Sequence, residues 1–565
     1  MSQLSEQEQV RREKLTKLRE LGINPYPANL YPVNQLSKQI KEKFSEGKKV
    51  TIAGRLMSRR IQGKASFAEL QDSEGRIQVY FNRDEICQGE DKTLYNDVYK
   101  KLLDIGDFIG IEGELFTTQV GEKSVRVNTF TLLSKALKPL PLPKTDADGN
   151  TFDEFNDPEM RYRQRYADLV VNPHVKNVFI KRSKLFAAMR NFFNEAGYFE
   201  VETPILQPIP GGAAARPFIT HHNSLDVPMY MRIACELYLK KVLIGGFDGV
   251  FEFAKTFRNE GMDRTHNPEF TMMEIYVAYK DYNWMMEFVE KLLEHCALAV
   301  NGTTKATFGE HNIDFKAPYA RVTMTDSIKH FTGFDISGKT EDEIRKAAKD
   351  MHIEVDDTMG KGKLIDEIFG EKCESNYINP TYIIDYPKEM SPLTKEHRTN
   401  PELTERFELI ICGKELANAY SELNDPIDQR ERFEDQVKLA GRGDDEATQF
   451  IDYDFLRALE YGMPPTSGMG IGMDRLIMFL TNNQSIQEVL FFPQMKPEKK
   501  AVAMSDEEKI VLAILKANSP IDLNTLKTQS GLSNKKWDKT IKGLTKLGLA
   551  KVTKIDYALV VELQE

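Results

Sequence analysis

The spacing of apolar and polar residues changes several times along the chain. Residues 5–21 are charged and have an apolar side at helical spacing, which predicts a solvated amphipathic helix. Residues 50–137 instead contain short β-rich runs separated by turn residues: 50–54, 66–70, 75–81 and 108–113, with one helical segment near 92–103. Closely spaced short strands predict a small barrel, and the five-stranded oligonucleotide-binding (OB) barrel is the natural candidate.

Composition and proline placement divide the chain further. The proline-rich run at 138–143 predicts a domain boundary, because proline stiffens linkers and stops regular structure. We therefore predict a helical segment at 1–49, an OB-fold domain at 50–143, a large α/β unit at 150–495 with a charged helical insertion at about 340–375, and a separate tail at 503–565.

Charge and cysteine content limit the possible functions. The formal net charge of −10 gives no global attraction to nucleic acid, so any RNA contact needs local basic surfaces or stacking. Five scattered cysteines without a CxxC pair argue against a disulfide framework or structural zinc and predict a cytoplasmic location. The N-terminus lacks a signal-peptide pattern, and no run is long enough to span a membrane.

The segment 257–276 predicts a binding site. It has the pattern of a strand, a polar loop and a returning strand. Because a strand has a period of two, its even positions share one face, and these are Arg258, Glu260, Phe270, Glu274 and Tyr276. That face offers an arginine for an anion, a ring for a flat base and carboxylates for a cation. A purely structural strand would bury such charges at a high cost.

Two glycine motifs need separate interpretations. Gly333–Thr340 matches the GxxxxGK[ST] phosphate loop, but the preceding residues predict a capped helix where that loop needs a strand, and Asp335 would repel phosphates. We expect a turn between two helices. In 468–475 glycine alternates along a strand, which would let a flat group lie against bare backbone, and Arg475 near the start of the next helix suits an anion. Taken alone, helix packing explains this second run equally well.

Three motifs in order resemble those of the class II aminoacyl-tRNA synthetases: 197–204 after a long helix, 257–270 and 468–475. The resemblance covers nearly all of residues 50–495. It implies an α+β multidomain protein with an N-terminal OB-fold barrel, a catalytic domain built on an antiparallel sheet with helices, and a homodimer.

The charge of the pocket bears on the amino acid. A barrel ahead of the catalytic unit marks the lysine, aspartate and asparagine subgroup, and the acidic set Glu236, Glu274 and Glu422 favours a cationic substrate. The strings 211–218 and 418–425 are similar to those of the lysyl-tRNA synthetase family. The implied reaction is ATP-dependent activation of L-lysine and its transfer to the 3′ end of tRNA(Lys). An aspartyl or asparaginyl type, a non-catalytic RNA-binding paralogue and a protein-lysylating paralogue are the alternatives.

The resemblance implies roles for individual residues. Arg258 and Arg475 would be catalytic, and Glu408 and Glu415 would bind Mg²⁺. Lysine would contact Gly212, Glu236, Arg258, Glu274, Tyr276, Asn418 and Glu422. ATP would contact Arg258, Glu260, Arg264, His266, Asn267, Phe270, Glu408 and Arg475. In the barrel, Arg59 and Arg60 would meet anticodon phosphates, Phe67 would stack on a base and Gln78 would read its edge. A core phenylalanine and solvated arginines explain the barrel residues as well.

One strand does not fit simple alternation. Asn418 and Glu422 share parity, but Glu415 is an odd number of residues from both. We therefore predict a β-bulge or strand break between Glu415 and Asn418.

The tail departs from the bacterial-type pattern of that family. Its predicted order is three helices (505–517, 522–530 and 533–547) and two short strands (550–553 and 558–561), which resembles a winged helix. The third helix carries Lys535, Lys536, Lys539, Lys542 and Lys546. Contact with nucleic acid and a docking or stabilising role with solvated lysines both stay open.

Overall fold

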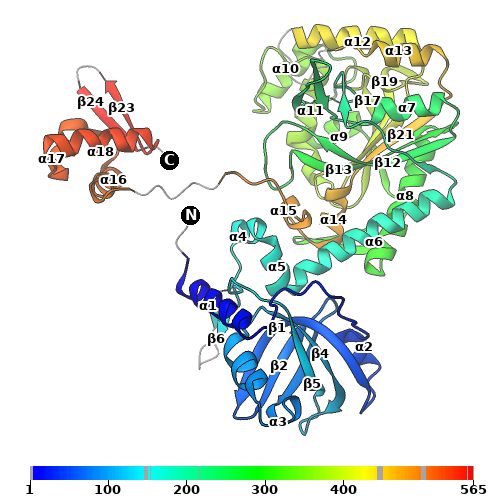
Figure 1. The fold of residues 1–565 in the computed structure, drawn as a ribbon. Coiled ribbons are helices and arrows are strands. Elements are labelled where there is room, and N and C mark those ends of the chain that lie inside the picture. The colour runs from blue at the N-terminus through cyan, green and yellow to red at the C-terminus, as the bar shows by residue number, and fades with distance from the viewer. Residues whose placement is uncertain are drawn as a thin grey trace. The chain divides into compact units, whose positions relative to one another are not determined.

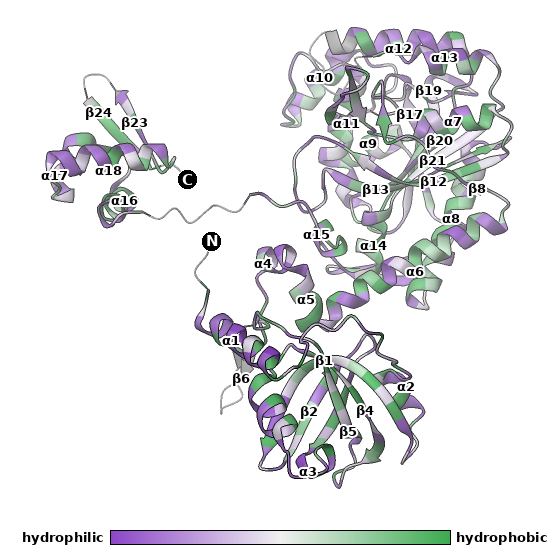
Figure 2. Ribbon diagram, in the orientation of Figure 1, coloured by the Kyte–Doolittle hydropathy of each residue, from purple (hydrophilic) through white to green (hydrophobic). Residues whose placement is uncertain are grey.

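The computed structural model describes residues 4–145, 151–152, 154–213, 215–441, 450–497, 504–555 and 558–563. The chain divides into two compact units, Met1–Gln494 and Met495–Glu565 (Figure 1). Hydrophobic residues concentrate in the barrel strands and in the helices packed on the large sheet, whereas polar residues dominate the surface helices α1 (Glu6–Glu20) and α12 (Pro426–Gly441) (Figure 2).

The N-terminal part forms a closed five-stranded barrel. Its strands are β1 (Lys49–Gln62), β2 (Ala65–Gln71), β3 (Arg76–Asn82), β4 (Phe108–Thr117) and β5 (Lys123–Ser134), in the order β1-β2-β3-β5-β4. Helices α1, α2 (Ser37–Glu42) and α3 (Arg83–Ile86) and a π-helical segment, Leu94–Leu102, accompany it. Alternate strand residues such as Ile52, Val79 and Ile111 fill the barrel core. The predicted OB-type barrel is confirmed.

The large part is built on a mixed but mainly antiparallel sheet. Its strand order is β16 (Ala320–Thr323), β17 (Thr381–Pro387), β19 (Asn400–Ile410), β20 (Glu415–Ser421), β21 (Thr466–Gly472), β13 (Glu269–Ala278), β12 (Gly249–Phe257) and β8 (Phe199–Glu200), with β18 (Glu396–His397) paired to β19. Only the outer pairs β16–β17 and β8–β12 run parallel among the described strands of this sheet. The predicted antiparallel sheet with helices is confirmed.

One face of this sheet is covered by three helices. Helices α6 (Pro173–Glu195), α8 (Tyr282–Asn301) and α14 (Met473–Thr481) pack on it through one continuous apolar core. Odd residues of β13, namely Met273, Ile275 and Val277, point into that core. The even residues of β13 therefore face the opposite side of the sheet.

The predicted insertion forms a small helical layer. Helices α10 (Glu341–Asp350) and α11 (Lys361–Lys372) lie within the predicted range of about 340–375. They share a core with the preceding helix α9 (Met324–Thr332) and with β17. Gly333 ends α9 in the left-handed conformation at φ 74°, and Thr340 caps α10. Asp335 pairs with Lys329 at 2.8 Å. The prediction of a turn between two helices, and not a phosphate loop, is confirmed.

Shorter elements complete this unit: β6 (Lys144–Thr145), β7 (Thr151–Phe152), α4 (Pro158–Arg163), α5 (Arg165–Val171), β9 (Leu206–Gln207), β10 (Ile219–His222), β11 (Val227–Met231), α7 (Glu236–Ile244), β14 (Lys305–Phe308), β15 (His311–Asp314), the 3₁₀ turns Glu374–Asn376 and Lys388–Met390, α13 (Tyr453–Glu460) and α15 (Ile486–Val489). Within the described ranges, no helix is long and apolar enough to cross a membrane.

The C-terminal unit contains α16 (Asp506–Asn518), β22 (Ile521–Asp522), α17 (Leu523–Ser530), α18 (Asn534–Lys546), β23 (Ala550–Ile555) and β24 (Ala558–Leu563). Its strands form an antiparallel sheet in the order β22-β24-β23. Leu515, Leu526, Trp537 and Leu544 belong to its own apolar core. The three predicted helices and the hairpin are present, and the short strand β22 adds a third strand that the sequence pattern did not reveal.

Candidate active site

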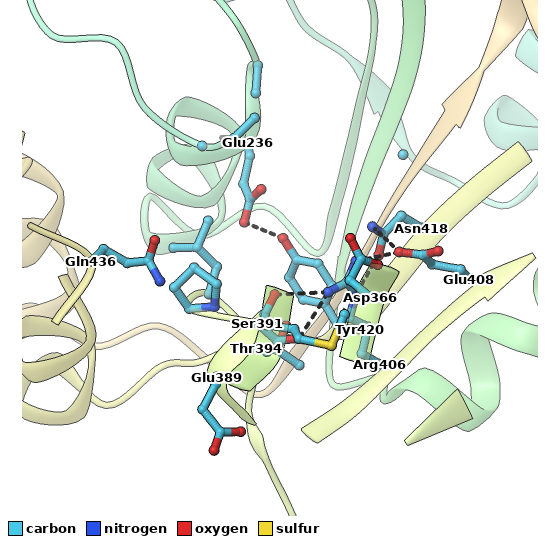
Figure 3. Close-up of a pocket in the computed structure, with 18 of the residues that line it drawn as sticks. Glu236, Asp366, Glu389, Ser391, Thr394, Arg406, Glu408, Asn418, Tyr420 and Gln436 are labelled. Carbon is cyan, nitrogen blue, oxygen red and sulfur yellow. Dashed lines mark hydrogen bonds and ion pairs between the residues drawn. The ribbon is translucent and has the colours of Figure 1, made fainter. Parts of the chain in front are cut away.

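A cleft of about 980 Å³ lies on the sheet face opposite the α6–α8–α14 core. Met272, Glu274 and Tyr276 of β13 line it, as does Arg258 directly after β12. The predicted alternation along the second motif therefore holds in the structure for these residues. Residues of α11 also line the cleft, including Asp366, so the insertion takes part in the site, which the sequence did not indicate (Figure 3).

Arg258 is held at the start of the loop between β12 and β13. Its backbone N–H donates to the carbonyl of Pro268 at 2.9 Å, and its guanidinium lies 5.2 Å from the ring centroid of Phe270. The buried Nε of Arg258 has no hydrogen-bond partner among the described residues. A buried, unpaired guanidinium N–H is costly, so an anionic ligand would be bound strongly here.

One end of the cleft is acidic. Glu274 accepts a hydrogen bond from the Tyr276 hydroxyl at 3.0 Å. Glu236 accepts one from the Tyr420 hydroxyl at 2.7 Å (Figure 3). Burial, with Glu236 nearby, raises the pKa of Glu274 to about 6. Gly212, with φ 87°, lies so close that a Cβ there would be 3.4 Å from Cβ of Glu236. The predicted lysine-binding residues Gly212, Glu236, Glu274 and Tyr276 are thus brought together.

Lys240 joins this acidic end and was missed at the sequence level. It is completely buried, its Nζ lies 2.6 Å from Oε1 of Glu236, and it also forms an ion pair with Glu422. Burial alone would lower the pKa of Lys240, but the two carboxylates outweigh it and raise that pKa. The spacing of four residues between Glu236 and Lys240 on one helix was the available signal.

Gly468 makes room for the acidic end. A Cβ at this position would overlap the Glu422 carboxylate and the Tyr276 ring. Gly470, two residues on, faces Met272 and Glu274. At Gly468 the flat group that lies against the bare backbone is the Tyr276 ring of the protein itself, and the glycines of the third motif shape the pocket wall.

The other end of the cleft holds Glu408, Glu415 and Asn418. Glu408 lies opposite Asn418 in the β19–β20 ladder, but the register shifts so that Leu409 pairs with Ala417 and Ile410 with Glu415. The predicted β-bulge between Glu415 and Asn418 is confirmed, and both side chains line the cleft.

Two carboxylates at this end could hold a cation. Burial and the neighbouring Glu415 raise the pKa of Glu408 to about 8, so a divalent cation beside them would relieve their repulsion. No cluster of three or more His, Cys, Asp or Glu in the described parts of the chain could hold a metal alone. The donor set therefore fits Mg²⁺ only if phosphate or water oxygens complete the coordination, as is usual for this ion.

Arg406 fixes the geometry of this end and was also missed. Its Nε donates to Oδ1 of Asn418 at 3.1 Å and a terminal nitrogen donates to Oγ of Ser391 at 3.0 Å, while it pairs with Glu408 (Figure 3). The only sign of its role in the sequence was that Arg406 and Glu408 are two residues apart on one strand, so that their side chains share a face. Arg475, in the first turn of α14, donates to the backbone carbonyl of Glu415.

In the loop of the second motif, three of the predicted ATP-binding residues are exposed and one is buried. Glu260, Arg264 and His266 are exposed, and Asp263 orders the loop by accepting from His266 Nδ1 at 2.8 Å. Asn267 is buried; its amide donates to the Glu269 carbonyl at 2.6 Å and accepts from the Gln494 N–H at 3.2 Å. The Asn267 side chain therefore holds the loop in place.

The barrel presents a second candidate site. Phe67 lies opposite Tyr80 across β2 and β3, with ring centroids 5.0 Å apart, and Gln78 shares the Tyr80 face. Phe116, 5.8 Å from Tyr80, extends this aromatic row, which the sequence did not reveal. Arg59 lies on the other face of β1, over the ring of Tyr99, whereas Arg60 is paired with Phe67. Strand alternation thus brings Arg60, but not Arg59, to this face.

Comparison with known proteins agrees with this geometry. Residues 157–496 match the family described as tRNA synthetases class II (D, K and N), and residues 50–133 match the OB-fold nucleic acid binding domain. The chain is 78% identical over 546 residues to the lysine–tRNA ligase of Christiangramia forsetii, covering 97% of this chain and 96% of that protein.

Two further relatives carry the same name. The lysine–tRNA ligase of Porphyromonas gingivalis is 67% identical over 517 residues, covering 91% of this chain and 89% of the relative. That of Azobacteroides pseudotrichonymphae is 63% identical over 499 residues, covering 88% of this chain and 99% of the relative. With its antiparallel sheet, its three motifs and these matches, the chain belongs to the class II tRNA synthetases of the D, K and N group.

Proposed function

We propose that this synthetase is a lysine–tRNA ligase, which activates L-lysine with ATP and transfers it to the 3′ end of tRNA(Lys). The observation that carries the proposal is the acidic end of the cleft. Glu236 and Glu274 line the cleft together with Arg258, and the buried Glu422 adjoins Gly468, which also lines it. Aspartate would place a further carboxyl charge against this wall, whereas lysine supplies two ammonium groups to it. The names of the relatives support the same substrate.

Each polar group of lysine has a counterpart. Glu274, Glu422 and the Tyr276 hydroxyl would hold the ε-ammonium, since a buried cation must be paired and hydrogen-bonded. Glu236 and the backbone at Gly212 would hold the α-ammonium. The unpaired Nε of Arg258, with Asn418, would orient the carboxylate.

ATP would lie beside Arg258 and Phe270. The Phe270 ring would stack on adenine, and Glu260, Arg264, His266 and Arg475 would approach the nucleotide. Glu408 and Glu415 would hold Mg²⁺, which supplies positive charge to the phosphate oxygens. The lysine carboxylate then attacks the α-phosphorus and forms the acyl–phosphate bond as pyrophosphate leaves. In the second step a ribose hydroxyl of the tRNA terminus attacks the acyl carbon and AMP leaves.

This chemistry needs positioning more than proton transfer. A carboxylate is already a nucleophile at neutral pH, so the first step requires no general base. It requires alignment and neutralisation of phosphate charge, which arginines provide.

Partner and location assignments complete the proposal. The Phe67, Gln78 and Tyr80 face of the barrel would bind the anticodon, with Arg60 near its phosphates and Arg59 on the opposite face of the strand.

Exposed apolar side chains on the first-motif side, including Phe199, Ile205, Leu206 and Ile219, would be covered in a homodimer. The five cysteines are free, which supports a reducing cytoplasmic location.

Amino-acid-dependent ATP–pyrophosphate exchange tests the proposal. We expect exchange with L-lysine and none above background with L-aspartate or L-asparagine. Exchange with aspartate but not lysine would overturn the assignment while leaving the family unchanged.

A further inference from the structure

We propose that the C-terminal unit binds the phosphate backbone of double-helical RNA, and so adds a second tRNA contact, through four lysines on one side of α18. This proposal rests on the proposed function only in naming tRNA as the RNA. The four residues, called here the lysine stripe, are Lys535, Lys539, Lys542 and Lys546.

Helical geometry places the stripe opposite the core. With 3.6 residues per turn, the four positions fall within an arc of about 60° and extend for about 16 Å along the axis. Trp537, Thr540 and Leu544, on the opposite side of α18, are buried. All four lysines are exposed. The packing of the unit therefore forces the stripe outward.

The ion pairs that the structure describes in this unit lie off the lysine stripe. None of its four lysines forms an ion pair with a residue in the described part of the chain. Lys536, which lies off the stripe, pairs instead with Glu507 at 2.7 Å. A row of like charges is unfavourable by itself, since residues four apart on a helix repel each other. An anionic partner with regularly spaced charges would remove that cost.

The tail and the rest of the chain carry formal charges of opposite sign. Residues 503–565 contain ten lysines and eight acidic residues, a formal charge of +2, whereas the whole chain carries −10. Three of the acidic residues, Asp506, Glu507 and Glu508, are in the first turn of α16. The basic side of α18 is thus a local feature that the global charge conceals.

The side chains available in the C-terminal unit favour contact with RNA phosphates over base reading or base stacking. The segment 503–565 has no arginine, so it lacks the bidentate donor typical of base reading. Its only aromatic side chain among the described residues, Trp537, is buried and cannot stack on a single-stranded base. Lysines alone act as point charges toward phosphates. A-form RNA is moreover contacted through its backbone because its major groove is too narrow to read.

The architecture agrees with this use. The order α16-β22-α17-α18-β23-β24 is that of a winged helix, in which the third helix is the one presented to nucleic acid. The unit has its own core, so it does not depend on the rest of the chain for its packing. The Azobacteroides relative, matched over 99% of its length, covers 88% of this chain, so part of this chain has no counterpart in that protein. Covalent attachment lets a weak contact add to the affinity of the whole protein.

The test uses the full-length protein. A K535Q/K539Q/K542Q/K546Q variant is compared with a matched K509Q/K516Q/K527Q/K536Q variant, which loses the same charge off the stripe. Binding of fluorescent tRNA and the KM for tRNA are measured between 50 and 200 mM KCl. Because each lost phosphate contact flattens the salt slope by about 0.7–0.9, the stripe variant should lose about 3 units of slope. Across this fourfold range of KCl, the ratio of the parent's tRNA affinity to that of the variant should therefore change by about 60-fold.

The outcomes separate the two proposals. Lysine-dependent ATP–pyrophosphate exchange needs no tRNA and should be unchanged in both variants. If the parent protein shows no such exchange, the proposed function fails, but direct tRNA binding still tests the stripe. Equal tRNA affinity and salt slope in the two variants would overturn the RNA proposal and assign the stripe to protein docking or to solvation.

Discussion

Nζ of Lys240 lies 2.6 Å from Oε1 of Glu236, inside a fully buried group that also includes Glu422. The acidic end of the cleft is therefore not a simple anionic hole. It contains three carboxylates and the ammonium group of Lys240. With all four groups ionised its formal charge is −2, which the two ammonium groups of a lysine substrate would balance. Lys240 pairs with both Glu236 and Glu422 and so orders the lysine site proposed above.

Removal of Lys240 should destabilise the catalytic part. In Lys240→Met two buried carboxylates lose their cation, and breaking a buried pair from one side typically costs about 3–5 kcal/mol. Urea unfolding should show this loss. Lys241→Met is the matched control, because Lys241 pairs with Asp454 at the surface and its removal should cost less than about 1 kcal/mol. Equal midpoints for the two variants would show that Lys240 is not energetically coupled to the carboxylates.

Lysine binding should weaken below pH 6. Glu274 must be ionised to pair with an ammonium, and burial with Glu236 nearby raises its pKa to about 6. The carboxylate form dominates above this pH and disappears below it, so the Kd for lysine should rise about tenfold between pH 7 and pH 5. Calorimetric titration over this range measures it. Glu274→Gln should bind lysine weakly at every pH, and an unchanged pH profile in that variant would assign the titration to another group.

Arg258→Ala should slow adenylate formation about 10²–10³-fold with the fold intact. The variant loses the guanidinium that we propose contacts both carboxylate and phosphate, and removal of one such charge-stabilising donor costs about 10²–10³ in rate. ATP–pyrophosphate exchange measures the loss, and circular dichroism checks the fold. Arg457→Ala, at an exposed arginine, is the control. Near-normal exchange in Arg258→Ala would contradict the assigned role.

Gly468→Ala should damage the lysine end selectively. The added methyl group would overlap Glu422 and Tyr276, and overpacking of this kind costs about 1–3 kcal/mol. We expect the KM for lysine to rise about tenfold, which corresponds to 1.4 kcal/mol. Gly472→Ala is the matched control from the same strand, since its nearest neighbour, Cβ of Arg475, would be 3.7 Å away. If both variants behave alike, Gly468 does not shape the pocket.

Local patterns were sufficient for much of this protein. Alternation along 257–276 identified the face that carries Glu274 and Tyr276, because a strand imposes its period of two on any side chain. Parity alone also required the irregularity after Glu415, which the ladder between β19 and β20 contains. The glycine turn at 333–340 and the three tail helices followed in the same way from capping and breaker residues.

The remaining features depend on contacts between residues distant in sequence. Lys240 and Arg406 were missed because an isolated lysine or arginine has the same pattern whether it is solvated or buried beside a carboxylate. Arg59 was placed on the anticodon face because neighbouring residues were treated together, although adjacent strand residues point to opposite faces. The sequence by itself determined the elements, the family motifs and the acidic character of the pocket. Only the tertiary structure decided which charges face one another, because burial and pairing are set by the packing of α7, β19 and β20 together.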